Sequence, residues 1–359
     1  MSFLSDGLLY ICYAYLMGSL LVQLAPAGSK PLVEIPRWTV NLSIVGIILL
    51  ASAPLLQIII RFGPSIGYGQ AISSVLFTFK EGRAYLIVVG LCILLLLQFL
   101  LFKNSLQEKK VLYPSVLITV CIIAIFGWSS HLGAIAGLAG AAIQFLHMLG
   151  VAVWIGILLV IAWFTQEARN WPAFLKWYTP VAIAGVLMIL VSGLMTMSYT
   201  TPEYVNSWML SYGQALLMKH LLFIPLIVFG FGNGFIYKHK LKSDPSFNPI
   251  PWLRAEAIIV ILVFGFTAFM KLQTPPHEVA ETLKYSEPSA VFTMLHPEAS
   301  LPLSISLTAW ALIPAIIALL SLGTIVYSFR RNRSRPGSSL IAGLVFVMSA
   351  YAAVMLCVQ

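Results

Sequence analysis

Two histidines in this 359-residue sequence could do chemistry, because each lies inside a long apolar run. His147 follows the segment GLAGAAIQFL, and His220 follows SYGQALLMK. An ionisable side chain inside a membrane-length apolar segment is costly to place there and usually serves a function. Imidazole is the commonest protein ligand for copper, zinc and haem iron. The two residues therefore predict a metal site within the apolar part of the protein.

Methionines near the two histidines narrow the identity of the metal. Four of them are candidate ligands: Met148, Met195, Met197 and Met218. Thioether and imidazole ligands together favour Cu(I) over Mg²⁺, Ca²⁺ or Mn²⁺. Methionine also fills gaps in apolar cores, so packing is the alternative interpretation for each of the four. Met195 and Met197 are two positions apart and point to different sides of a helix, so we expect one of them to be a packing residue.

Other candidate ligands lie in segments that are less apolar. His131, in the segment GWSSHLGA, is a candidate first ligand for copper on its way to His147. The stretch 273–303 is rich in proline and acidic residues, and His277, Met294 and His296 within it are candidates for capturing copper outside the membrane. Solvated loop residues without a metal are the alternative interpretation for this group.

Composition defines the elements that must position these residues. The chain is 60% hydrophobic and only 9% charged, with a mean hydropathy of +0.93, which predicts a polytopic membrane protein. A helix needs about 20 apolar residues to cross a membrane, and we therefore expect an all-α transmembrane bundle of about ten helices. The predicted spans are 7–25, 38–61, 83–103, 111–128, 138–164, 173–198, 212–237, 252–272, 304–328 and 338–357.

Basic residues in the connections predict the orientation of the bundle. Three connections on one side carry most of them: Lys103, Lys109 and Lys110; Lys238, Lys240 and Lys242; Arg330, Arg331, Arg333 and Arg335. The positive-inside rule makes this side cytoplasmic and places both termini outside. The net charge of +9 is then explained by these loops and by anionic membrane lipid, without nucleic acid as a partner. Residues 62–82 depart from the rule, and a half-inserted or surface helix over 65–79 would account for them.

Both histidines are predicted to lie at a similar depth. The helices over 138–164 and 212–237 each enter from the outer side in this topology. At 1.5 Å per residue, His147 lies about 14 Å and His220 about 12 Å below the outer surface. A similar depth favours one shared site over two separate histidines that each bind a hydroxyl or a carbonyl group of a helix.

Ordered motifs across the chain resemble the CopD/PcoD family of copper-resistance membrane proteins. The segment HMLGVAVWIGILL contains His147, Trp154 and Gly156, and VSGLMTM, SYGQALLMKH and LRAEA follow in order within residues 60–276. The resemblance implies copper handling at the cytoplasmic membrane of a bacterium, with inward movement. It divides the chain into a CopD-like transmembrane core over 1–276, an extracytoplasmic loop over 277–303 and two additional helices over 304–359.

These observations predict a copper importer and no enzyme. No GxxxxGK[ST] motif occurs in the sequence, so transport is expected to be passive or coupled to an ion gradient. An extracytoplasmic copper chaperone is the expected protein partner. Paired transmembrane histidines also suit an alternative, a b-type haem and quinone oxidoreductase. The third hypothesis is a copper insertase that delivers the metal without transporting it.

Overall fold

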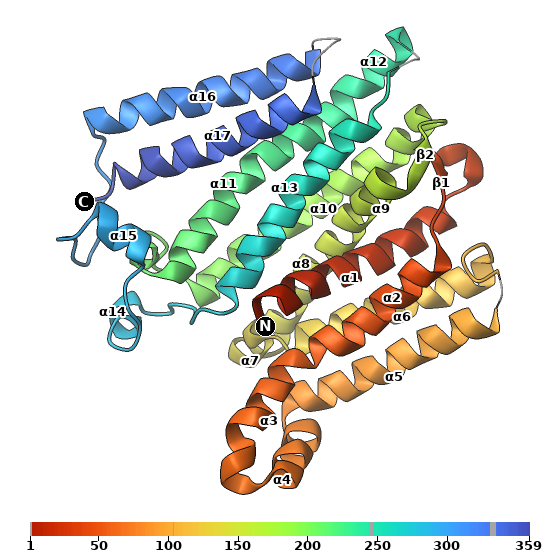
Figure 1. Ribbon diagram of the computed structural model, residues 1–359, viewed down its shortest axis with the longest axis horizontal. Helices are drawn as coiled ribbons and strands as arrows, with labels where there is room; N and C mark the ends of the chain where they lie inside the picture. The colour runs from red at the N-terminus through yellow and green to blue at the C-terminus, as the bar shows by residue number, and fades with distance from the viewer. Residues whose placement is uncertain (1, 103, 245–246, 331–334) are drawn as a thin grey trace. The chain divides into compact units, whose positions relative to one another are not determined.

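The computed structural model describes residues 2–102, 104–244, 247–330 and 335–359, and it is almost entirely helical (Figure 1). Within these residues, ten helices are long and apolar enough to cross a membrane. The predicted all-α architecture is therefore confirmed. Lys103, Arg331 and Arg333, which were part of the argument for orientation, lie outside the described residues.

The helix boundaries follow the predicted spans closely. Three of the spans contain a break or a wider turn, which joins α2 to α3, α8 to α9 and α11 to α12. The long helices are α1 (Ser2–Leu24), α2 (Arg37–Ala51), α3 (Ala53–Ile66), α5 (Lys80–Leu101), α6 (Lys109–Trp128), α8 (Gly137–Gly150), α9 (Gly156–Phe164), α10 (Trp171–Thr200), α11 (Ser211–Phe231), α13 (Ile250–Met270), α16 (Ala309–Arg330) and α17 (Pro336–Met355).

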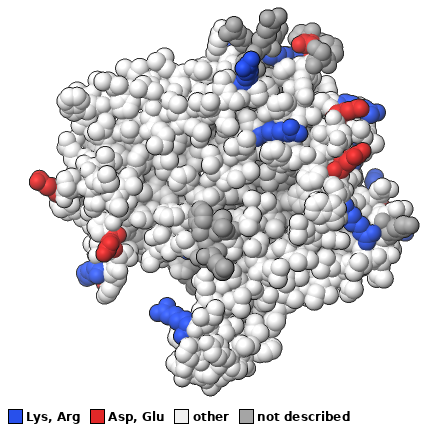
Figure 2. Space-filling view, viewed as in Figure 1, with Lys and Arg blue, Asp and Glu red and all other residues white. Residues whose placement is uncertain are grey.

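The chain divides into two compact units, Met1–Tyr199 and Thr200–Gln359. His147 belongs to unit 1 and His220 to unit 2. The divisions expected at residues 276 and 303 remain predictions. Charged side chains are sparse on the face that Figure 2 shows, as expected for a chain whose described surface is largely apolar.

Unit 1 is centred on α1, which packs against α2, α6 and α9. The contact between α1 and α9 is close because glycines meet there. A Cβ atom added to Gly18 would lie 2.1 Å from the carbonyl carbon of Gly156, and one added to Gly156 would lie 2.1 Å from the carbonyl oxygen of Ala14. Small residues allow helix backbones to approach in this way, so the glycine pair sets the packing of α9.

A hairpin occupies the segment for which a surface helix was expected. It consists of the end of α3, α4 (Tyr68–Ser73) and a π-helical turn at Ser74–Thr78, and it lies beyond one end of α5 (Figure 1). The single helix expected over 65–79 is interrupted because Gly67 adopts a positive φ of 86°.

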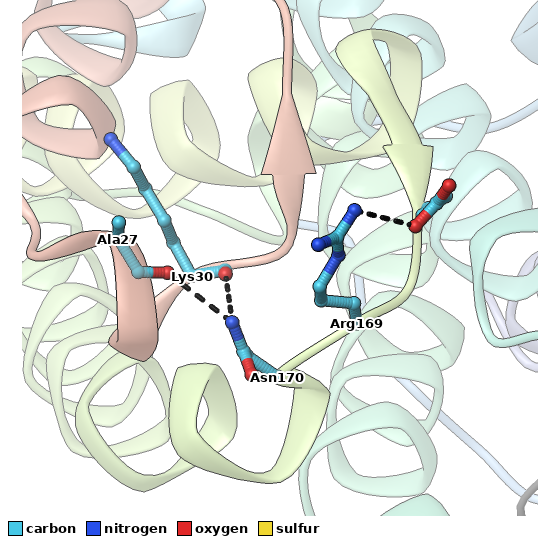
Figure 3. Close-up of polar contacts among 5 residues, drawn as sticks. Ala27, Lys30, Arg169 and Asn170 are labelled. Carbon is cyan, nitrogen blue, oxygen red and sulfur yellow. Dashed lines mark hydrogen bonds and ion pairs between the residues drawn. The ribbon is translucent and has the colours of Figure 1, made fainter.

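A short two-stranded sheet, which the sequence did not predict, joins two connections of unit 1. Strand β1 (Leu32–Val33) pairs antiparallel with β2 (Thr165–Glu167). The Nδ2 of Asn170 donates hydrogen bonds to the carbonyl groups of Ala27 and Lys30, at 3.3 and 3.4 Å (Figure 3). These contacts fix the start of α10 against the connection after α1.

Unit 2 is built around α11 and α13, which lie side by side and pack against α17, and α17 in turn packs along α16. A short helix, α12 (Tyr237–Ser243), continues α11 after a π-helical turn at Gly232–Ile236. The connection from α13 to α16 contains two more short helices, α14 (Val279–Thr282) and α15 (Ala290–Leu295). It ends against the C-terminal segment, where Ser304 and Gln359 exchange backbone hydrogen bonds.

Candidate functional site

The imidazole of His147 is held by a hydroxyl group of the neighbouring helix α10. Its Nδ1 lies 3.0 Å from the Oγ of Ser192. That hydroxyl donates its single proton to the carbonyl of Met188, so it accepts the hydrogen bond from the Nδ1–H of His147. The lone pair of the imidazole is then on Nε2, the atom that would bind a metal.

Gly193 on α10 and a wider helical turn lie next to this imidazole. A Cβ atom on Gly193 would lie 3.7 Å from the Cε1 of His147, so the ring lies against the α10 backbone. A π-helical turn at Val151–Ile155 follows His147 directly, and the backbone N–H of Val151 reaches the carbonyls of both His147 and Met148. Such turns are frequent at functional sites. Trp154, within the turn, is buried, and its carbonyl accepts a hydrogen bond from the hydroxyl of Tyr178.

The methionines of unit 1 differ in their position relative to His147. Thr196 is four residues beyond Ser192 and lies on the same face of α10, one turn further along. Met195 and Met197 lie on either side of that face. Met195 is 46% exposed, and Met148 is 3% exposed within the packed interior. Met148, Met195 and Met197 remain predicted ligands, and Met148 has the environment of a packing residue.

Removal of the Ser192 hydroxyl is expected to weaken copper binding at His147. In Ser192→Ala the Nδ1–H loses its acceptor, and the loss of such a supporting hydrogen bond typically costs 10–100-fold in metal affinity. The measurement is a competition titration of the purified variant with a Cu(I) chelator. Ser198→Ala is the matched control, because Ser198 is exposed on the same helix and donates to the Met195 carbonyl. Equal affinity of Ser192→Ala and the wild type would show that Ser192 does not orient a ligand.

The imidazole of His220 has a hydroxyl partner in unit 2. Its Nδ1 lies 2.8 Å from the hydroxyl oxygen of Tyr204, and the ring centroids are 5.4 Å apart. Burial raises the pKa of Tyr204 to about 12, so the phenol is neutral at physiological pH. A neutral phenol can donate to Nδ1 or accept from it. In the tautomer that is protonated at Nδ1, the phenol accepts the Nδ1–H and Nε2 of His220 carries the lone pair, as in His147.

Tyr204 is positioned by the connection between α10 and α11, which folds over the start of α11. Its ring lies edge-on to Trp208, with 5.4 Å between centroids. The Nε2 of Gln214 donates to the Trp208 carbonyl, at 2.6 Å. Gly213 permits the close approach, because a Cβ atom there would lie 2.0 Å from the carbonyl oxygen of Ser207. Met218, two residues before His220, points to another side of α11 and remains only a predicted ligand.

Removal of the Tyr204 hydroxyl tests whether its hydrogen bond to His220 strengthens copper binding by that histidine. Tyr204→Phe keeps the aromatic contacts and deletes the hydrogen bond, and a 10–100-fold loss of Cu(I) affinity is expected. The same chelator competition measures it. Tyr285→Phe is the control, because Tyr285 is 83% exposed in the connection between α13 and α16. A Tyr204→Phe protein that binds copper like the control would contradict a role for this hydroxyl.

The candidate residues for copper capture have different surroundings from those of His147 and His220. His131 begins the short helix α7 (His131–Ile135) and is exposed, as is His277, and Met294 is 84% exposed. The Nε2 of His296 donates to the carbonyl of Met355 at 3.0 Å, which fixes α15 to the end of α17. The Nε2 of His296 therefore already makes a structural hydrogen bond. Copper capture by His131, His277, Met294 and His296 remains a prediction.

Across the described part of the chain, no group of three or more His, Cys, Asp and Glu residues is arranged to hold a metal ion. Copper binding by His147, by His220 and by the four candidate methionines therefore remains a prediction.

The fold and its histidine-bearing helices define a multi-pass helical membrane protein. Residues 172–270 match the family model described as copper resistance protein D, CopD, which confirms the predicted resemblance over α10, α11 and α13. Copper transport protein CutJ of Bacillus subtilis (strain 168) is 24% identical over 294 residues, which are 77% of this chain and 53% of that protein. The chain thus spans about half the length of this relative. No solved structure matches the chain significantly.

Proposed function

We propose that this protein imports copper across the cytoplasmic membrane, and that His147 and His220 bind Cu(I) on the way. One observation carries the proposal. Each imidazole lies on a membrane-length helix and has its Nδ1 beside a hydroxyl group, that of Ser192 or Tyr204, in the arrangement that prepares Nε2 for a metal. The match to CopD and the name of the relative CutJ support copper as the transported ion.

In this proposal, the ligands that copper meets within the membrane are neutral. Cu(I) would first bind exposed groups such as His131, His277 and Met294, which a copper chaperone would load from outside. Neutral imidazole and thioether ligands would then replace its water within the membrane, where an unligated ion is costly. The sequence lacks an ATP-binding motif, so movement would follow the copper gradient or another ion gradient. Copper is the cargo in this scheme, and no chemical reaction is catalysed.

Uptake of Cu(I) into proteoliposomes tests the proposal. Vesicles containing the wild-type protein should accumulate copper faster than protein-free vesicles, with a trapped Cu(I) indicator as the readout. Bound copper without uptake would overturn transport and favour an insertase. An absorption spectrum of the purified protein is recorded in parallel, because a Soret band from stoichiometric haem would overturn the copper assignment.

A further inference from the structure

A buried carboxyl group in unit 2 lies outside the candidate copper ligands. Glu256, on α13, is 2% exposed, and its Oε2 accepts a hydrogen bond from the Nδ2 of Asn233 at 2.7 Å. Asn233 itself is 5% exposed. It lies thirteen residues beyond His220, or about 20 Å along the helix, on the predicted cytoplasmic side. Glu256 and Asn233 therefore form a separate polar cluster.

The backbone of α11 is shaped around this cluster. Asn233 is part of the π-helical turn at Gly232–Ile236, and such wider turns are frequent at functional sites. Gly230 lies beside the carboxyl group, since a Cβ atom there would be 3.4 Å from the Oε1 of Glu256. Residues of α11 and of the turn that follows it are therefore close to both oxygens of Glu256.

The hydrogen bonds of the cluster are incomplete if Glu256 is ionised. The Oδ1 of Asn233 is buried and has no hydrogen-bond donor among the described residues. An ionised carboxylate only accepts hydrogen bonds and so provides no donor for this oxygen. A carboxylic acid also donates one, and an acid and an amide pair through two reciprocal hydrogen bonds. If the amide is rotated by 180°, two oxygens meet at 2.7 Å, and that contact needs a proton between them as well.

The surroundings of the cluster disfavour a charged carboxylate. Trp252, one turn before Glu256, packs against Phe329 and Tyr237, with centroids 4.6 and 5.4 Å apart. Asn233 is the hydrogen-bond partner of the Glu256 side chain within the described part of the protein. The ionisable groups on α13 and on the elements packed near it are Arg254, which is exposed and two residues away; Tyr212, Lys219 and His220 on α11; Tyr237, Lys238 and Lys240 on α12; Tyr327 and Arg330 on α16; and Tyr351 on α17.

The buried hydroxyl of Tyr237 also has no hydrogen-bond partner among the described residues. The hydroxyl of Tyr351 is bonded elsewhere and not to Glu256, because it donates to the Oε1 of Gln214, near the start of α11. Burying a carboxylate without a paired cation costs several kcal/mol, and protonation removes that cost.

We propose that Glu256 and Asn233 form a proton-binding site, in which Glu256 is a neutral carboxylic acid at neutral pH. The bound proton is exchanged with the aqueous phase during transport, which makes the proton the coupling ion. The site itself is independent of the copper assignment, whereas the coupling rests on the proposed copper transport.

Infrared spectroscopy tests the site without copper. The wild-type protein at pH 7 should show the C=O stretching band of a protonated carboxylic acid, and Glu256→Gln should lack it. Gln keeps the size of the side chain and both donates and accepts hydrogen bonds, so it imitates the protonated acid and should fold. Glu287→Gln, which removes an exposed carboxylate, should retain the band. A band of equal strength in Glu256→Gln, or no band in the wild type, would overturn the proposal.

Uptake under imposed pH gradients tests the coupling. Copper uptake by wild-type proteoliposomes should differ between vesicles that are acidic inside and vesicles that are alkaline inside, and uptake by Glu256→Gln should be equal in both. Wild-type uptake that does not depend on the gradient would overturn the coupling. An absence of uptake under all conditions would overturn copper transport and with it the coupling, while the infrared band would still decide whether Glu256 holds a proton.

Discussion

Replacement of His147 or His220 with alanine is expected to weaken Cu(I) binding by about 100-fold or more. Loss of a supporting hydrogen bond already costs 10–100-fold in metal affinity, and loss of the ligand itself should cost at least as much. A 100-fold loss corresponds to about 2.7 kcal/mol. The side chains beside Nδ1, Ser192 and Tyr204, are hydroxyl groups, which are poor ligands for Cu(I) and cannot replace the imidazole.

The measurement is the copper content of each purified variant after dialysis against a Cu(I) chelator. His296→Ala is the comparison variant, because the Nε2 of His296 already donates to the Met355 carbonyl. All variants should elute as folded protein from a size-exclusion column. Wild-type copper content in both His147→Ala and His220→Ala would mean that neither histidine is a ligand.

Substitution of Gly156 with valine should prevent unit 1 from folding correctly. The Cβ atom at this position would lie 2.1 Å from the Ala14 carbonyl oxygen, a distance that requires α1 and α9 to separate. Overpacking typically costs about 1–3 kcal/mol when side chains can adjust, and a clash with backbone atoms leaves fewer ways to adjust. A large fall in the thermal unfolding temperature in detergent, or loss of folded protein, is the expected result.

Gly90→Ala provides the comparison for this experiment. Gly90 is on α5 in the same unit, and an added Cβ atom would meet nothing within 4 Å. Alanine also favours a helix over glycine, so the variant should be as stable as the wild type or slightly more stable. If Gly156→Val unfolded at the same temperature as Gly90→Ala, the close contact of α1 and α9 would not be part of the fold.

The sequence predicted the helices well because each is a continuous apolar run of membrane length. For example, α8 and α9 together fill Gly137–Phe164, where 138–164 was expected. The strands β1 and β2 were missed because they are very short and depend on pairing between residues more than a hundred positions apart. The π-helical turns leave no signal in hydropathy, since they change only the hydrogen-bond pattern of a helix that remains apolar.

The histidines were identifiable because an ionisable residue in an apolar run is unusual, but their partners were not. Ser192 is one of several hydroxyl residues on α10, and only its position in the motif VSGLMTM gave a signal. Tyr204 lies in a connection, sixteen residues before His220, and its contact depends on how that connection folds over α11. The Nε2 of His296, a predicted capture residue, donates to the Met355 carbonyl at the end of α17, a contact that sequence spacing does not reveal.

X-ray absorption spectroscopy of the copper-loaded protein tests the central claim most directly, because it reports which atoms bind the metal. We expect Cu(I) with imidazole nitrogen ligands, accompanied by sulfur scattering if Met197 or another predicted methionine takes part. The imidazole signal should be much weaker in the double variant that carries His147→Ala and His220→Ala. An imidazole signal that is unchanged in the double variant, or its absence in the wild type, would contradict copper binding by these two histidines.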